Sequence, residues 1–272
     1  MLEAPERKSR GGAILHNPMR RRERAIAEVI RGWGPDLVLL QEATDPRVVS
    51  RLSELTELQY YASRPGYSTA FLSRTEPESS KWLELPAIRR AVLEICLPPL
   101  TLFNVHLRAV HSNWTEQGRK RELGALLGLI RSEAATPHII AGDLNTLAPN
   151  EDLDLRKLPP RLRLVNWVTG GKVRYETIQI MLDAGYIDVY RSLHYDKGFT
   201  FPTWDPHVRL DYLFLPHAYR DRLESSEILD APGVRDASDH LPLLSVVNMR
   251  TKTAEGPETD LESGVPAQPI TP

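Results

Sequence analysis

Residues 138–145 combine a short apolar run with side chains that could do chemistry. They read His-Ile-Ile-Ala-Gly-Asp-Leu-Asn. The apolar part predicts a short buried strand, and Gly142 is expected to release the backbone into a turn. Asp143 and Asn145 are two positions apart, so they project to the same side if strand geometry continues. A carboxylate acceptor and an amide donor at one point suit a water held beside a phosphate. Taken alone, the tetrapeptide of residues 142–145 favours a simpler interpretation, an Asx turn that closes a strand.

Four further apolar runs end in, or carry, ionisable groups. They are residues 37–41 followed by Glu42, residues 101–107 with His106, residues 211–215 opened by Asp211, and residues 243–247 preceded by Asp239 and His240. Charged groups at buried strands cost stability unless they are paired or coordinated. One such strand end would be a solvated surface position, but five indicate a common site.

The order of these motifs points to a known family. Gln41-Glu42, Asn104-Val105-His106, Gly142-Asp143-Leu144-Asn145, Asp211-Tyr212 and Ser238-Asp239-His240 resemble the motifs of the endonuclease/exonuclease/phosphatase superfamily, the deoxyribonuclease I-like proteins. The resemblance runs from about residue 20 to residue 247. It implies an α+β fold, a four-layer α/β/β/α sandwich of two packed mixed β-sheets flanked by helices. Periodicity supports alternating helices and strands but does not choose this sandwich over a doubly wound sheet.

The same resemblance implies a divalent-metal-dependent hydrolase of phosphate esters, a phosphodiesterase, nuclease or phosphatase. By this resemblance, Asp143 and His240 activate or orient the attacking water, and Asp211 hydrogen-bonds His240 and raises its pKa. His106 and Asn145 would bind the phosphoryl oxygens. Glu42 and Asp239 would hold the metal. Carboxylate oxygens suit Mg²⁺ or Mn²⁺ better than zinc, which prefers His and Cys ligands.

Two alternatives stay open from the sequence. The substrate is a nucleic acid, a phospholipid headgroup or a small phosphorylated metabolite, since a fold does not settle a function. The chain could also be a catalytically inactive binding protein on the same scaffold, an alternative motivated by its weak N-terminal strand.

Composition narrows the class of protein. The chain has 272 residues, 41% of them hydrophobic, and a net charge of −2, which suits one large domain with no global attraction to nucleic acid. Polyanion binding must then come from local patches such as the arginines of residues 20–24, which are either solvated or in contact with phosphate. The single Cys96 excludes an intramolecular disulfide and is expected to be buried. No apolar run reaches membrane-spanning length, so we expect a soluble, cytoplasmic monomer without a transmembrane segment.

The termini are the least informative parts of the sequence. The family opens with a strand that ends in a metal-site asparagine, and residues 1–19 hold no convincing strand. Asn17 is a candidate for that asparagine; alternatively, this segment is the loop after a missing strand, with the start codon downstream of the true one. Residues 20–249 are assigned to the catalytic domain. Residues 250–272, rich in Thr, Glu and Pro, are predicted to form a disordered tail.

Several elements are expected between the motifs. We predict a helix over residues 20–33 that buries Ile26, Val29, Ile30 and Trp33, and a second helix that starts at Asp45-Pro46. Strands are expected at 67–73 and 89–96, joined by a surface connection.

The second half of the chain is expected to contain two more helices. The first buries Leu123, Leu126, Leu127 and Ile130, with residues 119–121 facing outward, and the second covers residues 173–184 and is closed by Gly185. Residues 147–171 between them are predicted to be irregular.

Overall fold

The computed structural model describes residues 18–84, 91–109, 113–132, 137–151, 154, 156–157, 160, 163–164, 167 and 175–249. The predictions for the N-terminal segment before Pro18, including Asn17, and for the 250–272 tail lie outside these residues. The same holds for about half of the predicted irregular stretch at 147–171 and for the first two residues of the predicted 173–184 helix.

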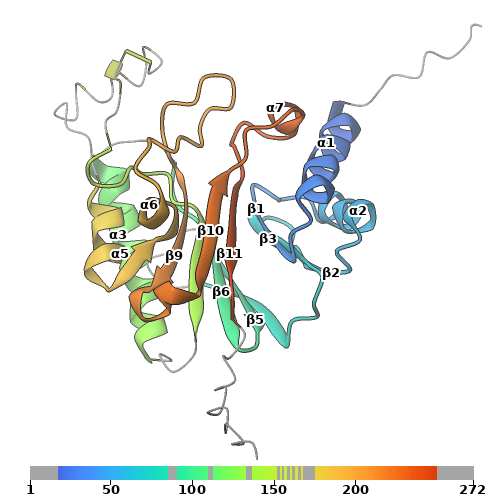
Figure 1. Cartoon of the computed structure of the whole chain (residues 1–272), viewed down its shortest axis with the longest axis horizontal. Helices are drawn as coiled ribbons and strands as arrows, with labels where there is room; N and C mark the ends of the chain where they lie inside the picture. Colours follow the sequence, from blue (N-terminus) through green and yellow to red (C-terminus); the bar gives the residue numbers. More distant parts are fainter. Residues whose placement is uncertain are drawn as a thin grey trace, which may run out of the picture.

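Helices and strands alternate along the chain (Figure 1). The helices are α1 (Pro18–Trp33), α2 (Pro46–Thr56), α3 (Asn113–Ser132), α5 (Glu176–Asp183), α6 (Val189–Leu193) and α7 (Val234–Ala237), with a 3₁₀ helix η1 (His217–Arg222). The strands are β1 (Leu37–Gln41), β2 (Tyr60–Ala62), β3 (Thr69–Ser73), β4 (Ser79–Leu83), β5 (Val92–Leu97), β6 (Leu100–His106), β7 (His138–Asp143), β8 (Tyr186–Asp188), β9 (Asp211–Pro216), β10 (Leu223–Ile228) and β11 (Leu243–Val247).

A six-stranded mixed sheet forms the centre of the molecule. Its strand order is β4-β5-β6-β7-β9-β8, in which β6 and β7 are parallel and the other neighbours are antiparallel. The register places His106 beside Asp143 and Asp143 beside Asp211. Because β6 and β7 end at the edge where β9 begins, three of the predicted site residues meet on adjacent strands.

Apolar clusters separate the layers. The first cluster, which includes Phe103 and Leu123, packs α3 and α5 against one face of the six-stranded sheet. The second, which includes Leu93 and Ile139, lies between the opposite face and the smaller sheets. The third, which includes Ala27, packs α1 and α2 on β1 and β3. Helices therefore lie outside and sheets inside, and the coarse prediction of a mixed helix and strand fold is confirmed.

The second β layer differs from the prediction of two mixed sheets. Within the described residues it consists of a three-stranded sheet, β1-β3-β2, and a two-stranded sheet, β10-β11. Both are antiparallel. The two small sheets stay separate because, in the described part of the chain, no strand pairs with the outer edge of β1 or of β11.

Two local predictions of structure were wrong. The predicted surface connection after β3 contains β4, an edge strand that pairs with β5; its polar residues hid it, and Lys81 forms an ion pair with Glu94 on the neighbouring strand at 3.0 Å. In α1 the predicted buried face is only partly correct: Ile30 is buried and Ile26 packs on the third cluster, but Trp33 is 44% exposed. Glu23 and Ala27, which were not predicted, are buried.

Two predictions of exposure were also wrong. Cys96 is partly exposed; it lies near the end of β5, where the last two residues of the strand are both only partly buried. Arg119 faces inward: it is fully buried in α3, and its Nη2 lies 2.8 Å from Glu116 Oε2. The predicted buried face of that helix is confirmed, since Leu123, Leu126, Leu127 and Ile130 belong to the first cluster. Asp45 caps α2 as predicted.

Candidate active site

Strand β7 carries Asp143 to the edge of the central sheet. The strand continues through Gly142, which has φ of +137°, and an added Cβ there would lie 2.0 Å from the Val105 carbonyl oxygen on β6. The expectation that Gly142 starts a turn was therefore wrong: the glycine lets β6 and β7 approach each other. The chain turns three residues later, at Asn145, whose φ is +53°.

Asp143 and Asn145 form a compact acid and amide pair. The Asn145 backbone N–H donates to Asp143 Oδ1 at 2.8 Å, and Asn145 Nδ2 donates to Asp143 Oδ2 at 2.7 Å. Asn145 Nδ2 also donates to the Leu107 carbonyl oxygen at 3.2 Å. The Asx turn of the simpler interpretation is present, and it is also what brings the two side chains together. In this arrangement both amide hydrogens of Asn145 are directed at protein acceptors, so the residue orients Asp143.

His240 and Asp211 form the second polar pair. His240 Nδ1 lies 2.7 Å from Asp211 Oδ2. Asp211 is fixed by its place in β9, opposite Asp143. The Phe201 ring lies 4.8 Å from the imidazole, centroid to centroid.

The segment around Phe201 also holds the backbone of both members of this pair. Thr200 Oγ1 accepts the N–H of Leu210 at 3.0 Å, and the Thr200 carbonyl oxygen accepts the N–H of Leu241 at 2.7 Å. Thr203 N–H donates to the Asp239 carbonyl oxygen at 2.9 Å. No sequence signal identified Thr200 as a support for the site.

Burial and neighbouring charges shift the pKa values of both acid–base residues. Burial and the like charge of Asp211 raise the pKa of Asp143 to about 7, against the opposing effect of His240. Burial disfavours the charged imidazole, but the hydrogen bond and charge of Asp211 outweigh it and raise the pKa of His240 to about 9. At neutral pH His240 is thus a cation, while Asp143 is poised to exchange a proton.

His106 lies close to Asp143 and is buried. Its Nε2 is 3.6 Å from Asp143 Oδ2, and the residue is 5% exposed. Its neighbour along β6, Asn104, is fully buried and spans the two β layers: Asn104 Nδ2 donates to the carbonyl oxygens of Leu40 and Ala70, and Gln41 Nε2 donates to Asn104 Oδ1 at 2.7 Å. The bridging role of Asn104 was not predicted.

Glu42 and Asp239 approach the site from the second β layer. Glu42 is exposed, directly follows β1, and its charge contributes to the raised pKa of Asp143. Asp239 Oδ1 lies 3.6 Å from Arg22 Nη2, and Arg22 Nε donates to the Ala237 carbonyl oxygen at 3.0 Å. One arginine of the basic run at the start of α1 therefore contacts a site carboxylate.

The donor set suits a hard cation in its chemistry. The site contains more carboxylates than cations. The carboxylates belong to Glu42, Asp143, Asp211 and Asp239, whereas only His240 and Arg22 supply positive charge beside them. Among the described residues, however, no three His, Cys, Asp or Glu side chains are grouped closely enough to hold a metal ion. Glu42 and Asp239 would thus supply few protein ligands, as in Mg²⁺ sites, where the ion keeps several waters.

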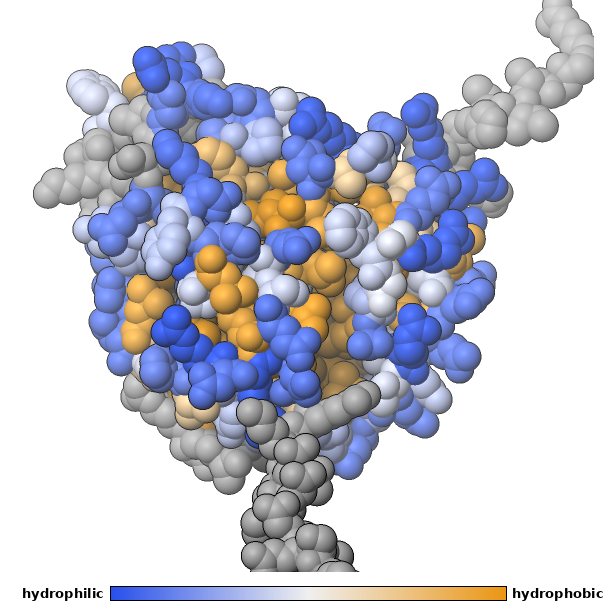
Figure 2. Space-filling view, viewed as in Figure 1, coloured by the Kyte–Doolittle hydropathy of each residue, from blue (hydrophilic) through white to orange (hydrophobic). Residues whose placement is uncertain are grey.

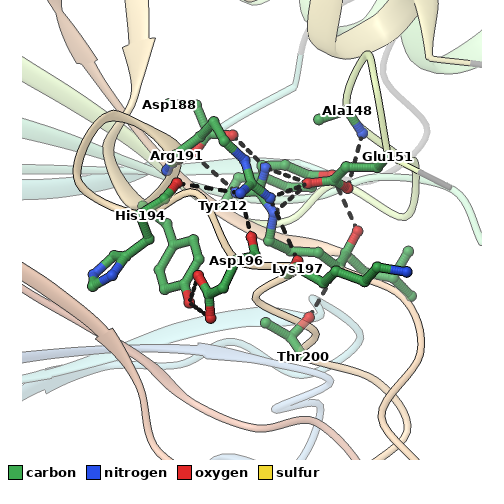
Figure 3. A network of polar contacts seen from close by, with 12 residues as sticks. Ala148, Glu151, Asp188, Arg191, His194, Asp196, Lys197, Thr200 and Tyr212 are labelled. Carbon is green, nitrogen blue, oxygen red and sulfur yellow. Dashed lines mark hydrogen bonds and ion pairs between the residues drawn. The ribbon is translucent and has the colours of Figure 1, made fainter.

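A buried ionic network supports the site from behind (Figure 3). Arg209, 1% exposed, lies two residues before Asp211. Its Nη1 and Nη2 donate to the two carboxylate oxygens of Asp188 at 2.9 and 2.6 Å, and its Nε donates to Glu151 Oε1 at 2.8 Å. Arg191 reaches the same Glu151 oxygen at 3.1 Å. The flanking apolar residues of Arg209 were the one sequence signal that this arginine is buried.

Further hydrogen bonds near the buried network join the segment after β7 to the start of β9. Tyr212 Oη donates a hydrogen bond to the Thr146 carbonyl oxygen at 3.0 Å, and Leu144 N–H donates to the Leu210 carbonyl oxygen at 2.9 Å. These contacts join the segment after Asp143 to the start of β9. The distance between Asp143 and Asp211 is thereby fixed from both sides.

Known structures share this fold. A 3′-5′ exonuclease from Neisseria meningitidis has 20% sequence identity and a TM-score of 0.59, with 82% of this chain and 95% of that chain covered. A 3′ phosphatase from Neisseria, bound to a product DNA hairpin, has 19% identity and a TM-score of 0.58 over 79% and 89%. An AP endonuclease from Archaeoglobus fulgidus has 18% identity and a TM-score of 0.63 over 84% and 95%.

Sequence comparison gives the family. No curated protein sequence matches the chain. No helix among the described residues has the length and apolar character needed to cross a membrane. The model of the Endonuclease/Exonuclease/phosphatase family matches residues 11–240, which include every motif of the candidate site. The chain therefore belongs to the endonuclease/exonuclease/phosphatase family, whose members hydrolyse phosphate esters.

Proposed function

We propose that the protein is a divalent-metal-dependent phosphoester hydrolase that uses an activated water. The observation that carries this proposal is the charged His240, held by Asp211 at 2.7 Å, beside Asp143 with a pKa of about 7. A base near neutrality beside a fixed cation is the combination that general base catalysis on an anionic substrate requires.

The two pairs of residues divide the work. Asp143, held by two hydrogen bonds from Asn145, accepts a proton from the attacking water. His240 donates its free Nε2–H to a phosphoryl oxygen, while its Nδ1 stays on Asp211, which fixes the tautomer and orientation of the ring. His106, close to Asp143, is placed to donate to a second phosphoryl oxygen. The rate is expected to be highest between pH 7 and pH 9, where Asp143 is ionised and His240 is still charged.

Glu42 and Asp239 would hold the divalent cation, with Mg²⁺ or Mn²⁺ as the fitting ions. When bound, the ion would supply positive charge to neutralise the phosphate. The surplus of carboxylates around Asp143 supports this assignment.

The substrate class that we test first is nucleic acid. One protein of the same fold was solved with a product DNA hairpin, and the exposed Arg22, in the basic run at the start of α1, lies beside Asp239. Phospholipid headgroups and small phosphorylated metabolites form the other arms of the test.

A catalytically inactive binding protein is the second candidate. Two observations favour it: the described residues contain no preassembled metal cluster, and both amide hydrogens of Asn145 are bonded within the protein. Such a protein would bind the phosphate through His240 without turning it over.

Hydrolysis of bis-p-nitrophenyl phosphate with Mg²⁺, and with EDTA, separates the two candidates. If the protein is an enzyme, we expect metal-dependent turnover, with a rate that falls about 10³-fold in Asp143→Asn. The matched control is Asp36→Asn, which should leave the rate unchanged. Its carboxylate is 92% exposed, and Asp36 precedes β1, at the end of the strand opposite Glu42. Absence of turnover with every metal, together with retained phosphate binding, would support the inactive protein.

A phosphoester panel then identifies the substrate. It comprises single- and double-stranded DNA, RNA, sphingomyelin, inositol phosphates and nucleotides, each with Mg²⁺. The expected result is the highest kcat/KM on a nucleic acid. A higher value on sphingomyelin or an inositol phosphate would reject nucleic acid and keep the hydrolase.

A further inference from the structure

Trp204 is an exposed tryptophan beside the candidate site. The residue is 68% exposed, whereas the two residues before it, Pro202 and Thr203, are buried. Tryptophan carries a large, mostly apolar ring that folded proteins bury for much of its area. The proton transfer proposed for Asp143 and His240 does not use this ring. Trp204 is therefore a candidate contact for a part of the substrate other than the phosphate.

The loop that carries Trp204 is closed by backbone hydrogen bonds. Phe201 and Val208 form an isolated β-bridge: the Phe201 N–H donates to the Val208 carbonyl oxygen at 2.9 Å, and the Val208 N–H donates back to the Phe201 carbonyl oxygen at 3.1 Å. Within the loop, the Asp205 N–H donates to the Pro202 carbonyl oxygen at 3.1 Å. Trp204 lies inside this turn, so the residues on both sides set its backbone position.

Thr203 attaches the loop to the segment that carries His240. Thr203 Oγ1 donates to the Ser238 carbonyl oxygen at 3.2 Å, and the Thr203 N–H donates to the Asp239 carbonyl oxygen at 2.9 Å. Thr203 directly precedes Trp204, and Asp239 directly precedes His240. The backbone therefore holds the tryptophan close to the imidazole, in a loop whose hydrogen bonds fix its shape.

One aromatic ring separates Trp204 from His240. The Trp204 and Phe201 centroids are 6.2 Å apart at an interplanar angle of 65°, and the Phe201 and His240 centroids are 4.8 Å apart. This contact with Phe201 leaves most of Trp204 exposed. Proteins that bind single-stranded nucleic acids use such surfaces, since aromatic side chains stack the bases beside the groove that binds the backbone. The position of Trp204 thus suits a base next to the phosphate that His240 binds.

The surroundings of Trp204 are charged. Lys157 Nζ donates to Asp205 Oδ1 at 2.7 Å, next to Trp204 in the chain, and Arg22 contacts Asp239. The site end of the molecule carries α7 and the start of α1, at the top of Figure 1; in the same view, Figure 2 shows that hydrophilic residues make up most of this upper rim, with hydrophobic residues mainly in the band below it. A membrane contact needs a broad apolar face, so a charged polymer with stackable rings fits this rim better.

We propose that Trp204 stacks an unpaired nucleobase next to the phosphate that His240 binds, with Phe201 supporting the tryptophan ring from the site side. The proposal rests on the hydrolase function proposed above and narrows its substrate to nucleic acid with an unpaired base at the site. A base inside a duplex must first leave the stack of its neighbours before it can cover the ring. The substrate class is therefore single strands, frayed strand ends and looped nucleotides.

Fluorescence anisotropy with labelled oligonucleotides tests this proposal on the full chain, in Mg²⁺ and on the Asp143→Asn background that slows turnover. The probes are a thymidine single strand, an abasic strand of the same length, and a blunt duplex. The thymidine strand should bind about tenfold more tightly than the abasic strand, because stacking adds to the affinity. Added Trp204→Ala should remove this preference and leave duplex binding unchanged, whereas Trp204→Phe should keep most of it. The control Trp33→Ala, 44% exposed at the far end of α1, should keep all of it.

Other results would overturn the proposal. Equal affinity for the thymidine and abasic strands would reject base stacking and keep the hydrolase, and so would a preference that survives Trp204→Ala. An equal loss on the duplex and the single strand would show that Trp204 contacts the backbone instead. If no oligonucleotide binds, nucleic acid is rejected as the substrate together with the stacking, while turnover of bis-p-nitrophenyl phosphate still decides the hydrolase. Binding to phosphatidylcholine and phosphatidylserine vesicles that is lost in Trp204→Ala would assign the ring to a membrane.

Discussion

The two halves of the candidate site are held in different ways. His106, Asp143 and Asp211 lie side by side on three hydrogen-bonded strands of one sheet, and a buried ionic network backs them. Glu42 and Asp239 sit at the ends of two separate small sheets and are more exposed. The half assigned to proton transfer is fixed by backbone register, whereas the half assigned to the metal depends on how the second layer is packed.

This difference suggests where the protein is rigid and where it adjusts. A carboxylate whose pKa is set by its neighbours needs constant distances, because a change of position changes the proton affinity. A hard cation tolerates a flexible set of oxygen ligands and waters better. Variants that weaken one half or the other test this contrast.

Removal of Arg209 should break the rigid half. In Arg209→Met, the buried carboxylate of Asp188 loses its cation and Glu151 keeps only Arg191, so the expected loss of stability is about 3–5 kcal/mol. Urea denaturation measures it. Arg156→Met is the control, because the Arg156 side chain is 90% exposed in its ion pair with Asp154. Equal midpoints for the two variants would show that the buried network does not hold the sheet.

Replacement of Asp211 should affect chemistry more than folding. In Asp211→Asn, His240 loses the group that keeps it charged, so its pKa falls from about 9 toward or below the ordinary 6.5. The alkaline limb of the rate profile should move to lower pH, and kcat should fall about 10²-fold. Because the folded-state pKa is raised, stability contributed by the pair is complete below about pH 6.5 and is lost as pH rises through about 9. An unchanged alkaline limb would show that His240 does not set it.

Asn104 should couple the two halves. Asn104→Ala removes the buried amide that bonds to Leu40, Ala70 and Gln41, at an expected cost of about 1–3 kcal/mol. The Mg²⁺ concentration needed for half-maximal rate should rise, because Gln41 directly precedes Glu42. The control is the exposed Asn248→Ala. A stability loss without any change in metal dependence would argue against coupling through Asn104.

Arg22→Ala should have the smallest effect on stability. Its pair with Asp239 joins side chains that are 58% and 52% exposed at 3.6 Å, so the loss is expected to stay below about 1 kcal/mol. Thermal unfolding at low and high salt measures it. A loss as large as that of Arg209→Met would mean that the exposed half is as firmly held as the buried one.

The sequence was sufficient to locate the candidate residues. Apolar runs that end in acids or imidazoles can be recognised from the amino-acid sequence alone, and the order of these motifs indicated the family. Glu42 and Asp143 were placed at strand ends because the strands themselves are apolar and short. These signals are local, so they can be read without knowledge of the partners.

The contacts that hold those residues were not predictable in the same way. The partners of Arg209 lie 21 and 58 residues away, and those of Asn104 lie 34, 63 and 64 residues away. Arg119 was expected at the surface as part of the basic run 119–121, because nothing in that run indicates that Glu116, one helical turn away, is buried. Strand β4 was missed because an edge strand tolerates polar residues.

Gly142 separates two kinds of constraint inside one tetrapeptide. A saturation library over residues 142–145 should return almost only glycine at position 142 when selected for soluble expression, since any larger residue meets the Val105 carbonyl oxygen. The same selection should accept many residues at position 143, which only a screen for turnover would restrict. One short motif thus records a limit on assembly at its first position and a limit on reactivity at its second.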